Sequence, residues 1–453
     1  MSDDHQDQAG DIERYPTLGE AGRRMLDFMR HHPAAPIFRN ASGNRLLAAE
    51  VDQLRLFEHE IGAARVGWTP GQLPDWLADH VASTFATVPH YRQFGSPPLR
   101  FENIAPVSRA DFAADIAPFV PDQVPLERLI NFRTTGTTGH PLLIASHPVV
   151  AARYLAFHKR ALRRFGIELT HGAGQVGVVL LGFQRACFTY VSVTPAMGES
   201  GLAKINLHPK DWRDPADRAR YLDALAPEVV AGDPISFTEL LTLPLTMRPR
   251  ALISVSMLLL PGLRAQLEQR FGCPVLDIYS LNEVGPVGVF DAAAGGHVLL
   301  QPGLYVEILD RHGQAVAAGE RGEITVSGGF NFCLPLLRYR TGDHASLAWM
   351  ADGPLLVGLS GRSPVRYRLD NGEWINNIDI THALKSLPIA HFGFHQAADG
   401  ALSLRLTPAG LYLADQARAL LASLFGAQSV GVSVLAADDK VVQYTSELDG
   451  ALT

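Results

Sequence analysis

The chain has 453 residues, of which 47% are hydrophobic and only 19% are charged. This length suggests about three units of ~150 residues, or one large unit with a satellite, and the composition excludes a chain that is disordered throughout. The 39 basic and 46 acidic side chains give a formal charge of −7. That balance argues against a protein that binds nucleic acid through clustered cations, but not against one that holds a mononucleotide.

The cysteine content and the N-terminus indicate a protein of a reducing compartment. Cys187, Cys273 and Cys333 lie far apart without a CxxC pair, which excludes a disulfide framework and a cysteine-rich zinc site. The acidic N-terminus lacks the basic start and apolar run of a signal peptide. The apolar stretch 251–263 is interrupted by Pro261 and is shorter than the ~20 residues that cross a bilayer. We therefore expect a cytoplasmic protein without a membrane partner.

The N-terminal third is predicted to be mainly helical. Residues 1–15 are expected to form a flexible tail, and helical patterns separated by turns continue to about residue 89. Apolar residues at helical spacing predict one helix over 77–88. A second amphipathic helix is predicted over 147–165, where Gly166 suits the C-cap.

From about residue 147, short apolar runs alternate with helices, which is typical of a parallel sheet covered on both faces. A proline near the start and a glycine at the end predict a helix over 261–272. Residues 304–328 contain two alternating runs around a turn and predict antiparallel hairpins. The four apolar runs are 176–181, 227–232, 251–257 and 275–279.

These patterns predict an α/β fold in two parts. A large domain, 16–360, is expected to contain mixed and parallel sheets covered by helices, together with antiparallel hairpins. The remaining residues, 361–453, are numerous enough for a small separate α+β lobe. Within this lobe, a helix is predicted from Leu411 to Phe425, with a strand-like run on either side.

A Thr/Gly-rich segment is the strongest functional signal of the chain. Glycines let a backbone curl so that several N–H groups point inward, and threonine hydroxyls add further donors. Such a loop suits the β- and γ-phosphates of a nucleotide, although the GxxxxGK[ST] pattern of a Walker loop is absent. Taken alone, it also suits a plain surface turn. The segment consists of Thr134, Thr135, Gly136, Thr137, Thr138 and Gly139.

Three later segments favour the nucleotide. The segment DIYSLNEVG begins in a predicted strand and runs past its end, which places Tyr279, Asn282 and Glu283 where open α/β sheets bind ligands. Asp343, predicted to lie in a tight turn, suits the acceptance of hydrogen bonds from ribose hydroxyls. Arg362 offers a second contact to ribose or phosphate.

Together and in this order, the segments resemble the adenylate-forming enzymes of the acyl-CoA synthetase superfamily, and within it the phenylacetate–CoA ligase type. HVASTFATVPHYRQFG and APVSRADFAADIAPF before the loop, and LPLLRYRTGDHASL after it, extend the resemblance to roughly residues 75–445. It implies the fold of these enzymes and ATP-dependent activation of a carboxylic acid, an aryl or other small apolar acid, as an acyl-adenylate with release of pyrophosphate. Transfer of the acyl group to CoA would follow.

The resemblance also implies roles for individual residues. The six residues of the Thr/Gly loop would hold the polyphosphate, and Thr135 would be catalytic. Glu283 would bind Mg²⁺, which prefers carboxylate oxygens. Lys440 would reach the α-phosphate and the acid.

The nucleoside would be held by a second group of residues. Tyr279 would stack on adenine, and either Asp277 or Ser280 would meet the edge of the ring. Asp343 would bind the ribose hydroxyls, with Arg362 beside it.

Several residues depart from the pattern of the family. His140 stands where lysine is usual, Asn282 where threonine or serine is usual, and Asp439 where glycine usually precedes the lysine corresponding to Lys440. Pro364 stands where the family has an aspartate that acts as the hinge of the C-terminal lobe. Because proline fixes φ, we expect thioester formation to be less secure than adenylation.

The acyl pocket is expected to lie between two segments that follow predicted strands, 182–188 and 231–237. Aromatic side chains there favour a flat or apolar acid, and Gln184 and Arg185 offer contacts to a polar substituent. The same aromatic residues are also typical of a packed core. The expected pocket residues are Phe183, Phe188, Pro234 and Phe237.

Two alternatives stay open at this point. One keeps the adenylation but transfers the acyl group to a carrier-protein thiol, an amine or another nucleophile. The other is a nucleotide-binding homologue impaired in catalysis, which His140, Pro364 and Asp439 favour. The helical N-terminal segment offers a surface for a homodimer.

Overall fold

The computed structural model describes residues 10–133, 143–184, 187–351, 353–361, 365–389, 391–426, 428–435 and 443–448. These residues divide into two compact units. The first contains those within Met1–Gly43, Leu169–Asp277 and Pro364–Thr453, and the second contains those within Asn44–Glu168 and Ile278–Ser363. Among the described helices, none combines the length and hydrophobicity needed to span a bilayer.

The first unit is built on a largely parallel sheet with the strand order β9-β8-β7-β4-β6-β5, in which only β5 runs antiparallel to its neighbour. The four predicted strands are confirmed, and so is their parallel pairing. Every residue of β8 is buried, as expected for a short apolar strand covered on both faces. The strands are β4 (Val176–Gly182), β5 (Tyr190–Thr194), β6 (Ser200–Asn206), β7 (Val229–Gly232), β8 (Ala251–Ser254) and β9 (Val275–Leu281).

Helices pack on this sheet and complete its core. Helix α2 packs against β5 and β6, and α9 packs against β4. Helix α10 begins at Pro261 and ends before Gly272, whose φ of +67° closes the helix as the sequence predicted. Side chains of the helices and strands form one hydrophobic cluster, to which Phe237 and Leu263 belong. The helices are α1 (Asp11–Arg14), α2 (Glu20–His31), α8 (Asp217–Leu225), α9 (Pro234–Leu241) and α10 (Pro261–Phe271).

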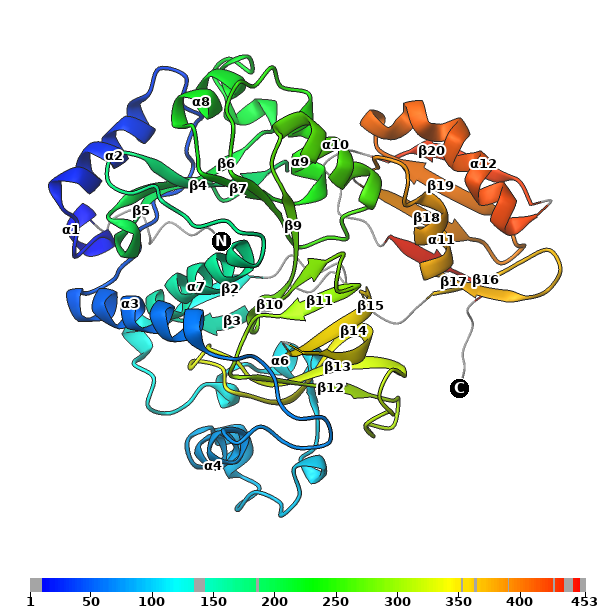
Figure 1. The fold of residues 1–453 in the computed structure, drawn as a ribbon, viewed down its shortest axis with the longest axis horizontal. Helices are drawn as coiled ribbons and strands as arrows, with labels where there is room; N and C mark the ends of the chain where they lie inside the picture. The colour runs from blue at the N-terminus through cyan, green and yellow to red at the C-terminus, as the bar shows by residue number, and fades with distance from the viewer. Residues whose placement is uncertain are drawn as a thin grey trace. The chain divides into compact units, whose positions relative to one another are not determined.

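The C-terminal part of this unit is a small α+β lobe, drawn in orange in Figure 1. Its sheet has the order β20-β19-β18-β21. Ala417, Leu421 and Phe425 lie four residues apart on α12 and are fully buried in the core of the lobe. The predicted helix starts at Ala414 because Pro408–Leu413 forms a 3₁₀ helix before it. The elements are β16 (Arg366–Arg368), β17 (Trp374–Asn376), α11 (Asn377–Leu384), β18 (Phe392–Gln396), β19 (Leu402–Leu406), α12 (Ala414–Phe425), β20 (Val430–Val434) and β21 (Tyr444–Ser446).

The second unit contains the antiparallel strands. Their order is β12-β13-β14-β15-β11-β10-β9, β1 pairs in parallel with β14, and β2 and β3 form a separate hairpin. The hairpin predicted within 304–328 is confirmed as β12 paired with β13. The strands are β1 (Val107–Ser108), β2 (Ile130–Arg133), β3 (Leu143–Ser146), β10 (Gly285–Asp291), β11 (Gly296–Leu299), β12 (Leu304–Leu309), β13 (Arg321–Gly328), β14 (Leu336–Met350) and β15 (Gly353–Ser360).

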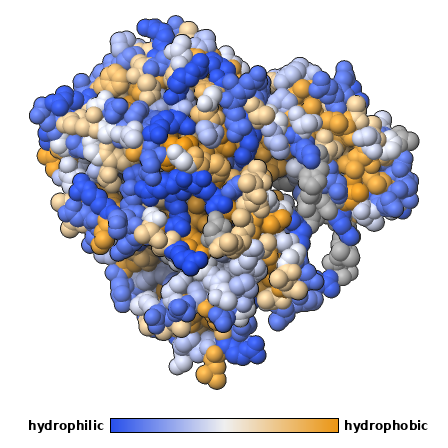
Figure 2. Space-filling view, viewed as in Figure 1, coloured by the Kyte–Doolittle hydropathy of each residue, from blue (hydrophilic) through white to orange (hydrophobic). Residues whose placement is uncertain are grey.

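The helices of the second unit include both of those predicted from apolar spacing. The helix predicted over 147–165 is α7, and the His147 side chain caps it by accepting a hydrogen bond from the Val149 N–H. Apolar side chains of α4, α5 and α6 belong to a second hydrophobic cluster. Hydrophilic residues, with hydrophobic ones among them, occupy much of the molecular face visible in Figure 2. The helices are α3 (Ala48–Ala63), α4 (Leu77–Thr87), α5 (Pro89–Arg92), α6 (Arg109–Ala114) and α7 (Pro148–Arg164).

A buried ion pair ties β14 to the loops around it. Arg338 is 2% exposed, and its Nε lies 3.3 Å from an oxygen of the buried Glu307. Three further N–H groups of the guanidinium donate to the backbone carbonyls of Glu102, Ile104 and Gly313. Each charge is therefore both paired and hydrogen-bonded, which is the condition for a buried ion pair to be tolerated.

Replacing only the cation of this pair is expected to destabilise the protein strongly. In Arg338→Met, Glu307 stays buried without its partner, at a cost of about 3–5 kcal/mol in the free energy of unfolding. Urea denaturation followed by circular dichroism measures this loss. The double variant Arg338→Met/Glu307→Leu removes both charges and should recover a large part of it. Equal stability of the wild type and Arg338→Met would contradict the importance of this pair.

Candidate active site

The candidate site in the second unit starts where β9 ends. The strand runs to Leu281, and Asn282 and Glu283 follow directly, as the sequence predicted. Asn282 is exposed, whereas Glu283 is only 5% exposed. The chain then reverses into β10 at Gly285, whose φ is +73°. A β-carbon at this glycine would lie 2.6 Å from the Phe330 ring, so the turn requires glycine on both grounds.

The buried carboxylate of Glu283 is held from two sides. The Tyr339 hydroxyl donates a hydrogen bond to its Oε1 at 2.8 Å, and Nη1 of Arg109 lies 3.9 Å from the same oxygen. Arg109 is the first residue of α6, which Ser108 and Asp111 hold with a capping box. The role of Arg109 was not predicted. The S-x-x-D pattern of the capping box marked a helix start, but nothing in the sequence linked that start to β9.

A second hydroxyl–carboxylate bond lies beside the first. The Tyr279 hydroxyl donates to Oδ2 of Asp343 at 2.7 Å. The two bonds are reciprocal, since β9 and its turn supply Tyr279 and Glu283 whereas β14 supplies Tyr339 and Asp343. Within each segment the tyrosine precedes the acid by four residues (283 − 279 and 343 − 339). We call this arrangement the tyrosine–acid clasp.

The conformation of β14 at Asp343 differs from the prediction. The expected tight turn is wrong, because RTGD lies inside β14, where the pairing with β13 shifts in register. Gly342 has a φ of +80° and donates to Glu323, while the Thr341 hydroxyl accepts from the Asp343 N–H. A bulge therefore presents the Asp343 side chain. Gly361 lies nearby, since a β-carbon placed there would be 3.5 Å from Oδ1 of Asp343.

Burial alters the acidities around the clasp. Desolvation raises the pKa of Tyr279 well above its usual range, and the nearby Asp343 raises it further. Desolvation also raises the pKa of Tyr339, and the nearby Glu283 raises it further. Both hydroxyls therefore stay protonated and act as donors. At the start of β9, burial raises the pKa of Asp277 to about 7, although Arg264 opposes the shift.

The donor set of the clasp fits Mg²⁺. The carboxylate of Glu283 is a hard oxygen ligand of the kind that this ion prefers, and Mg²⁺ usually takes only one or two protein carboxylates together with phosphates and water. No group of three His, Cys, Asp or Glu side chains that could hold a metal ion lies among the described residues. The binding of Mg²⁺ by Glu283 stays a prediction.

The residues expected to line the acyl pocket lie in the first unit. Strands β4 and β7 are parallel neighbours, so the segments that follow them leave the same edge of the sheet. Phe183 packs against the core, and its ring centroid is 5.6 Å from that of His208. Phe188 is 43% exposed, whereas Phe237 is fully buried in the core. Pro234 is the first residue of α9. Their role as a pocket stays a prediction.

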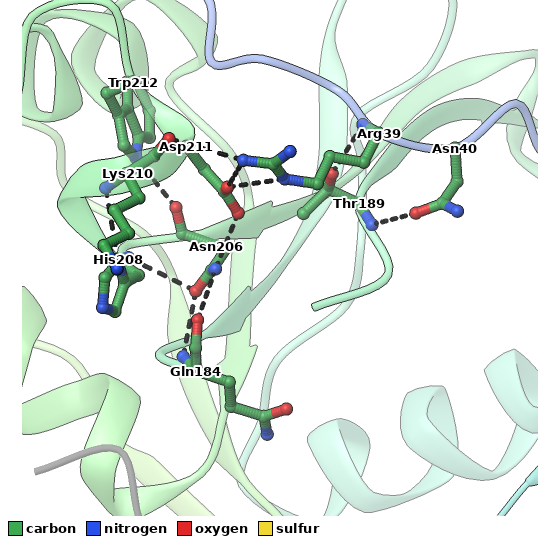
Figure 3. A network of polar contacts seen from close by, with 9 residues as sticks. All are labelled: Arg39, Asn40, Gln184, Thr189, Asn206, His208, Lys210, Asp211 and Trp212. Atoms are coloured by element: carbon green, nitrogen blue, oxygen red, sulfur yellow. Dashed lines mark hydrogen bonds and ion pairs between the residues drawn. The ribbon is translucent and has the colours of Figure 1, made fainter. Parts of the chain in front are cut away.

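Figure 3 shows the polar network that holds the segment after β4. Asn206 accepts from the Gln184 N–H and donates to the Gln184 carbonyl. The Asn206 amide also donates to Asp211, which is paired with Arg39. At the far end of the segment, the Thr189 N–H donates to Asn40. The segment after β4 is thus held by β6 at Gln184 and by the N-terminal segment at Thr189.

Several predicted residues lie outside the described part of the chain, and their roles stay predictions. They are Thr134, Thr135, Gly136, Thr137, Thr138, Gly139, His140, Arg185, Arg362, Pro364, Asp439 and Lys440. Of the described candidates, the structure brings together Tyr279, Glu283 and Asp343. Ser280 lies next to Tyr279 in β9 and pairs with Pro286 of β10.

Comparison with known proteins identifies relatives of the chain, although no protein-family model matches it. The chain is 24% identical over 326 residues to the phenylacetate-coenzyme A ligase of Aromatoleum evansii. The matched region covers 66% of this chain and 68% of that protein. A shorter match to the phenylacetate-coenzyme A ligase of Escherichia coli (strain K12) has 36% identity over 90 residues, which is 19% of this chain and 21% of that protein. The expected resemblance is confirmed.

Solved structures show the same fold. The crystal structure of 2-hydroxyisobutyryl-CoA ligase in the postadenylation state, in complex with R3-HIB-AMP, has a TM-score of 0.60 at 17% identity and covers 89% of this chain and 90% of its own. An open conformation of the same ligase with 2-HIB-AMP and CoA has a TM-score of 0.51 at 17% identity, covering 81% of this chain and 89% of that one. The α/β fold of the adenylate-forming ligases, with its small C-terminal lobe, is thereby confirmed.

The raised pKa of Asp277 makes the stability of the protein depend on pH. Because the folded pKa of about 7 exceeds the ~4 of an unfolded aspartate, folding favours the protonated form. Stability should fall as pH rises from about 4 to 7 and then level off. At pH 8 the wild type must bury an ionised Asp277, and Asp277→Asn removes the free-energy cost of burying that charge. The melting temperature of this variant should therefore exceed that of the wild type at pH 8, by roughly 2–4 °C per kcal/mol recovered.

The difference between Asp277→Asn and the wild type should be much smaller at pH 4.5 than at pH 8, which differential scanning calorimetry at both pH values can measure. The exposed Asp75 is the matched control, and Asp75→Asn should show no such pH-dependent gain. A gain of Asp277→Asn that is equal at both pH values would contradict the raised pKa.

Proposed function

We propose that this protein uses ATP to activate a small carboxylic acid as an acyl-adenylate and then transfers the acyl group to CoA. The tyrosine–acid clasp is the observation that carries the proposal, because it holds two carboxylates at the end of β9 with hydroxyl donors and Arg109 beside them. The sequence similarity to phenylacetate-coenzyme A ligases supports the same activity. The enzyme is then an AMP-forming acid–thiol ligase.

In the first half-reaction, a carboxylate oxygen of the acid attacks the α-phosphorus of ATP. A new P–O bond forms, the bond between the α-phosphorus and the bridging oxygen breaks, and pyrophosphate leaves. The protein has to align two anions and neutralise developing charge. Glu283 would hold Mg²⁺, while Arg109, 31% exposed beside it, would meet phosphate oxygens. This arginine would supply a cation that the Thr/Gly loop lacks, since His140 stands there in place of the usual lysine.

The clasp also orders the nucleoside part of the proposed site. Asp343 would accept from the ribose hydroxyls, and its bond from Tyr279 keeps one carboxylate oxygen in a fixed direction. The Tyr279 ring, held through that hydroxyl, would offer its face to adenine. Asp277, with its pKa near 7, would be able to donate to a ring nitrogen when it is protonated.

In the second half-reaction, the CoA thiol loses its proton and the sulfur attacks the acyl carbon, so that a thioester forms and AMP leaves. Lys440 is assigned to the first half-reaction, and the lobe formed by 361–453 would have to turn between the two. Pro364 would restrict that movement by fixing one backbone dihedral. A carrier-protein thiol or an amine is the alternative acceptor.

Exchange of pyrophosphate into ATP tests the first half-reaction without any acceptor. With a panel of aryl and alkyl acids, the wild type should show acid-dependent exchange, and Glu283→Gln and Lys440→Ala should reduce it about 100-fold or more, since each removes a group that stabilises charge in the transition state. Two controls carry the same substitutions on exposed side chains, Glu20→Gln and Lys385→Ala. They should keep wild-type exchange. No exchange with any acid would refute the proposed activity.

Rapid mixing with CoA tests the second half-reaction. We expect the acyl-adenylate to accumulate before the thioester, because Pro364 slows the turn of the lobe. Pro364→Asp should speed up thioester formation severalfold without changing the rate of adenylation, and omission of CoA should stop the reaction at the adenylate. If the wild type forms the thioester as fast as the adenylate, Pro364 does not limit the rate of the second half-reaction.

A further inference from the structure

The second unit contains a cavity of about 590 Å³ that lies wholly within it. Helices α3, α4 and α7 line this cavity, together with the loops that precede β12 and β14. The walls are largely apolar, and the volume is typical of a small-molecule site. The described lining residues include none of those predicted for the nucleotide site or the acyl pocket. Four aromatic rings contribute to the walls, those of Phe57, Phe157, Phe330 and Phe332.

The described lining residues carry a single fixed charge, which is that of Arg153 on α7. No aspartate or glutamate is among them. His80 also lines the cavity, but burial lowers its pKa, so its imidazole is neutral at pH 7. The charge of the described lining is therefore +1, which favours a ligand with one negative charge.

The Arg153 guanidinium forms no ion pair within the described residues. Its Nη1 donates to the Phe330 carbonyl at 3.1 Å, and its Cζ lies 4.5 Å and 5.5 Å from the ring centroids of Phe57 and Phe332. Nε is buried without a hydrogen-bond acceptor in this part of the chain. The charge of Glu60 acts on Arg153, but Glu60 is exposed and screened by water. The desolvated cation therefore lacks a close partner of opposite charge, which is costly.

Other cations of α7 show how this helix satisfies a positive charge. Nζ of Lys159 lies 2.6 Å from a carboxylate oxygen of Glu58. Arg160 donates to two backbone carbonyls at the C-terminal end of α3, where the helix dipole is negative. Arg153 has a single carbonyl acceptor and two aromatic rings instead, which indicates that its charge is available to a ligand.

The cavity lies against the turn that carries Glu283. Gln301 lines the cavity, and its Nε2 donates to the backbone carbonyls on both sides of Gly285, at 2.6 and 2.8 Å. Phe330 also lines the cavity, and its ring occupies the place that a β-carbon of Gly285 would need. A ligand in the cavity would therefore contact the residues that hold this turn.

We propose that this cavity binds a small aromatic carboxylate, with the carboxylate on Arg153 and the ring among the four phenylalanines. A carboxylate carries one negative charge at pH 7, which matches the single guanidinium. The planar guanidinium has five N–H groups and binds a carboxylate through two of them in parallel. Edge-to-face contacts with the phenylalanines would favour a flat ring. The proposal does not depend on the proposed ligase activity.

Crystals of the full chain soaked with 4-iodobenzoate test the proposal, because the anomalous signal of iodine locates the compound. We expect an iodine peak in the cavity, with the carboxylate within hydrogen-bond distance of Arg153. Iodine found elsewhere and absent from the cavity would overturn the proposal. This result decides even if a variant of Arg153 fails to fold.

Isothermal titration calorimetry with 4-iodobenzoate measures the contribution of the charge. Arg153→Gln should weaken binding by about tenfold or more, because a hydrogen-bonded charge pair is lost. Arg153→Lys keeps the charge without the planar fork and should weaken it less. The control Arg55→Gln changes an exposed arginine of α3, paired with Asp52, and should bind as the wild type does. Equal affinity of the wild type and Arg153→Gln would contradict the proposal.

Further compounds separate the two recognised parts of the ligand. Acetate lacks the ring and benzyl alcohol lacks the charge, so both should bind more weakly than 4-iodobenzoate. A calorimetric signal that is lost in Phe188→Ala but kept in Arg153→Gln would place the compound in the predicted acyl pocket and refute the proposal.

Discussion

The tyrosine–acid clasp is the constraint on which the candidate active site depends. Two carboxylates, the buried Glu283 and the partly exposed Asp343, each accept a hydrogen bond from a tyrosine of the opposite segment. Hydrogen bonds to charged groups contribute about 1.5–3 kcal/mol each, and a buried carboxylate without such a partner is costly. Pairing the acids crosswise holds the end of β9 and the bulge of β14 at one place. The strands themselves are not neighbours in the sheet, since β10, β11 and β15 lie between them.

The clasp also explains how carboxylates can serve anionic substrates. A carboxylate repels phosphate, so it is useful there only with a metal ion or when it faces hydroxyl groups. Glu283 has Arg109 beside it and suits the first arrangement, whereas Asp343 suits the second. Because both tyrosines stay protonated, they donate to the acids throughout the proposed reaction and add no charge of their own. The different roles proposed for the two acids thus follow from their neighbours rather than from their residue types.

Much of this architecture was predictable because its signals are local. Apolar runs bounded by glycine and proline identified the parallel strands, and the order of the motifs identified Tyr279, Glu283 and Asp343. Features that join remote segments were not predictable. Arg109 reaches Glu283 only because β1 pairs with β14 and positions α6. Asp343 was assigned to a turn, since Thr-Gly-Asp is common in turns, but pairing with β13 drew it into a bulged strand. The burial of Phe237 likewise depends on the packing of α9 on the sheet.

The proposed nucleotide site also shows how an acidic protein can bind anions. With a net charge of −7, the chain has no general attraction for phosphate, so each anion site has to concentrate donors locally. The proposed nucleotide site would rely on backbone N–H groups and hydroxyls, with Arg109 and a metal ion adding charge. This arrangement is not visible in the overall composition, because it arises from where the fold places a few side chains.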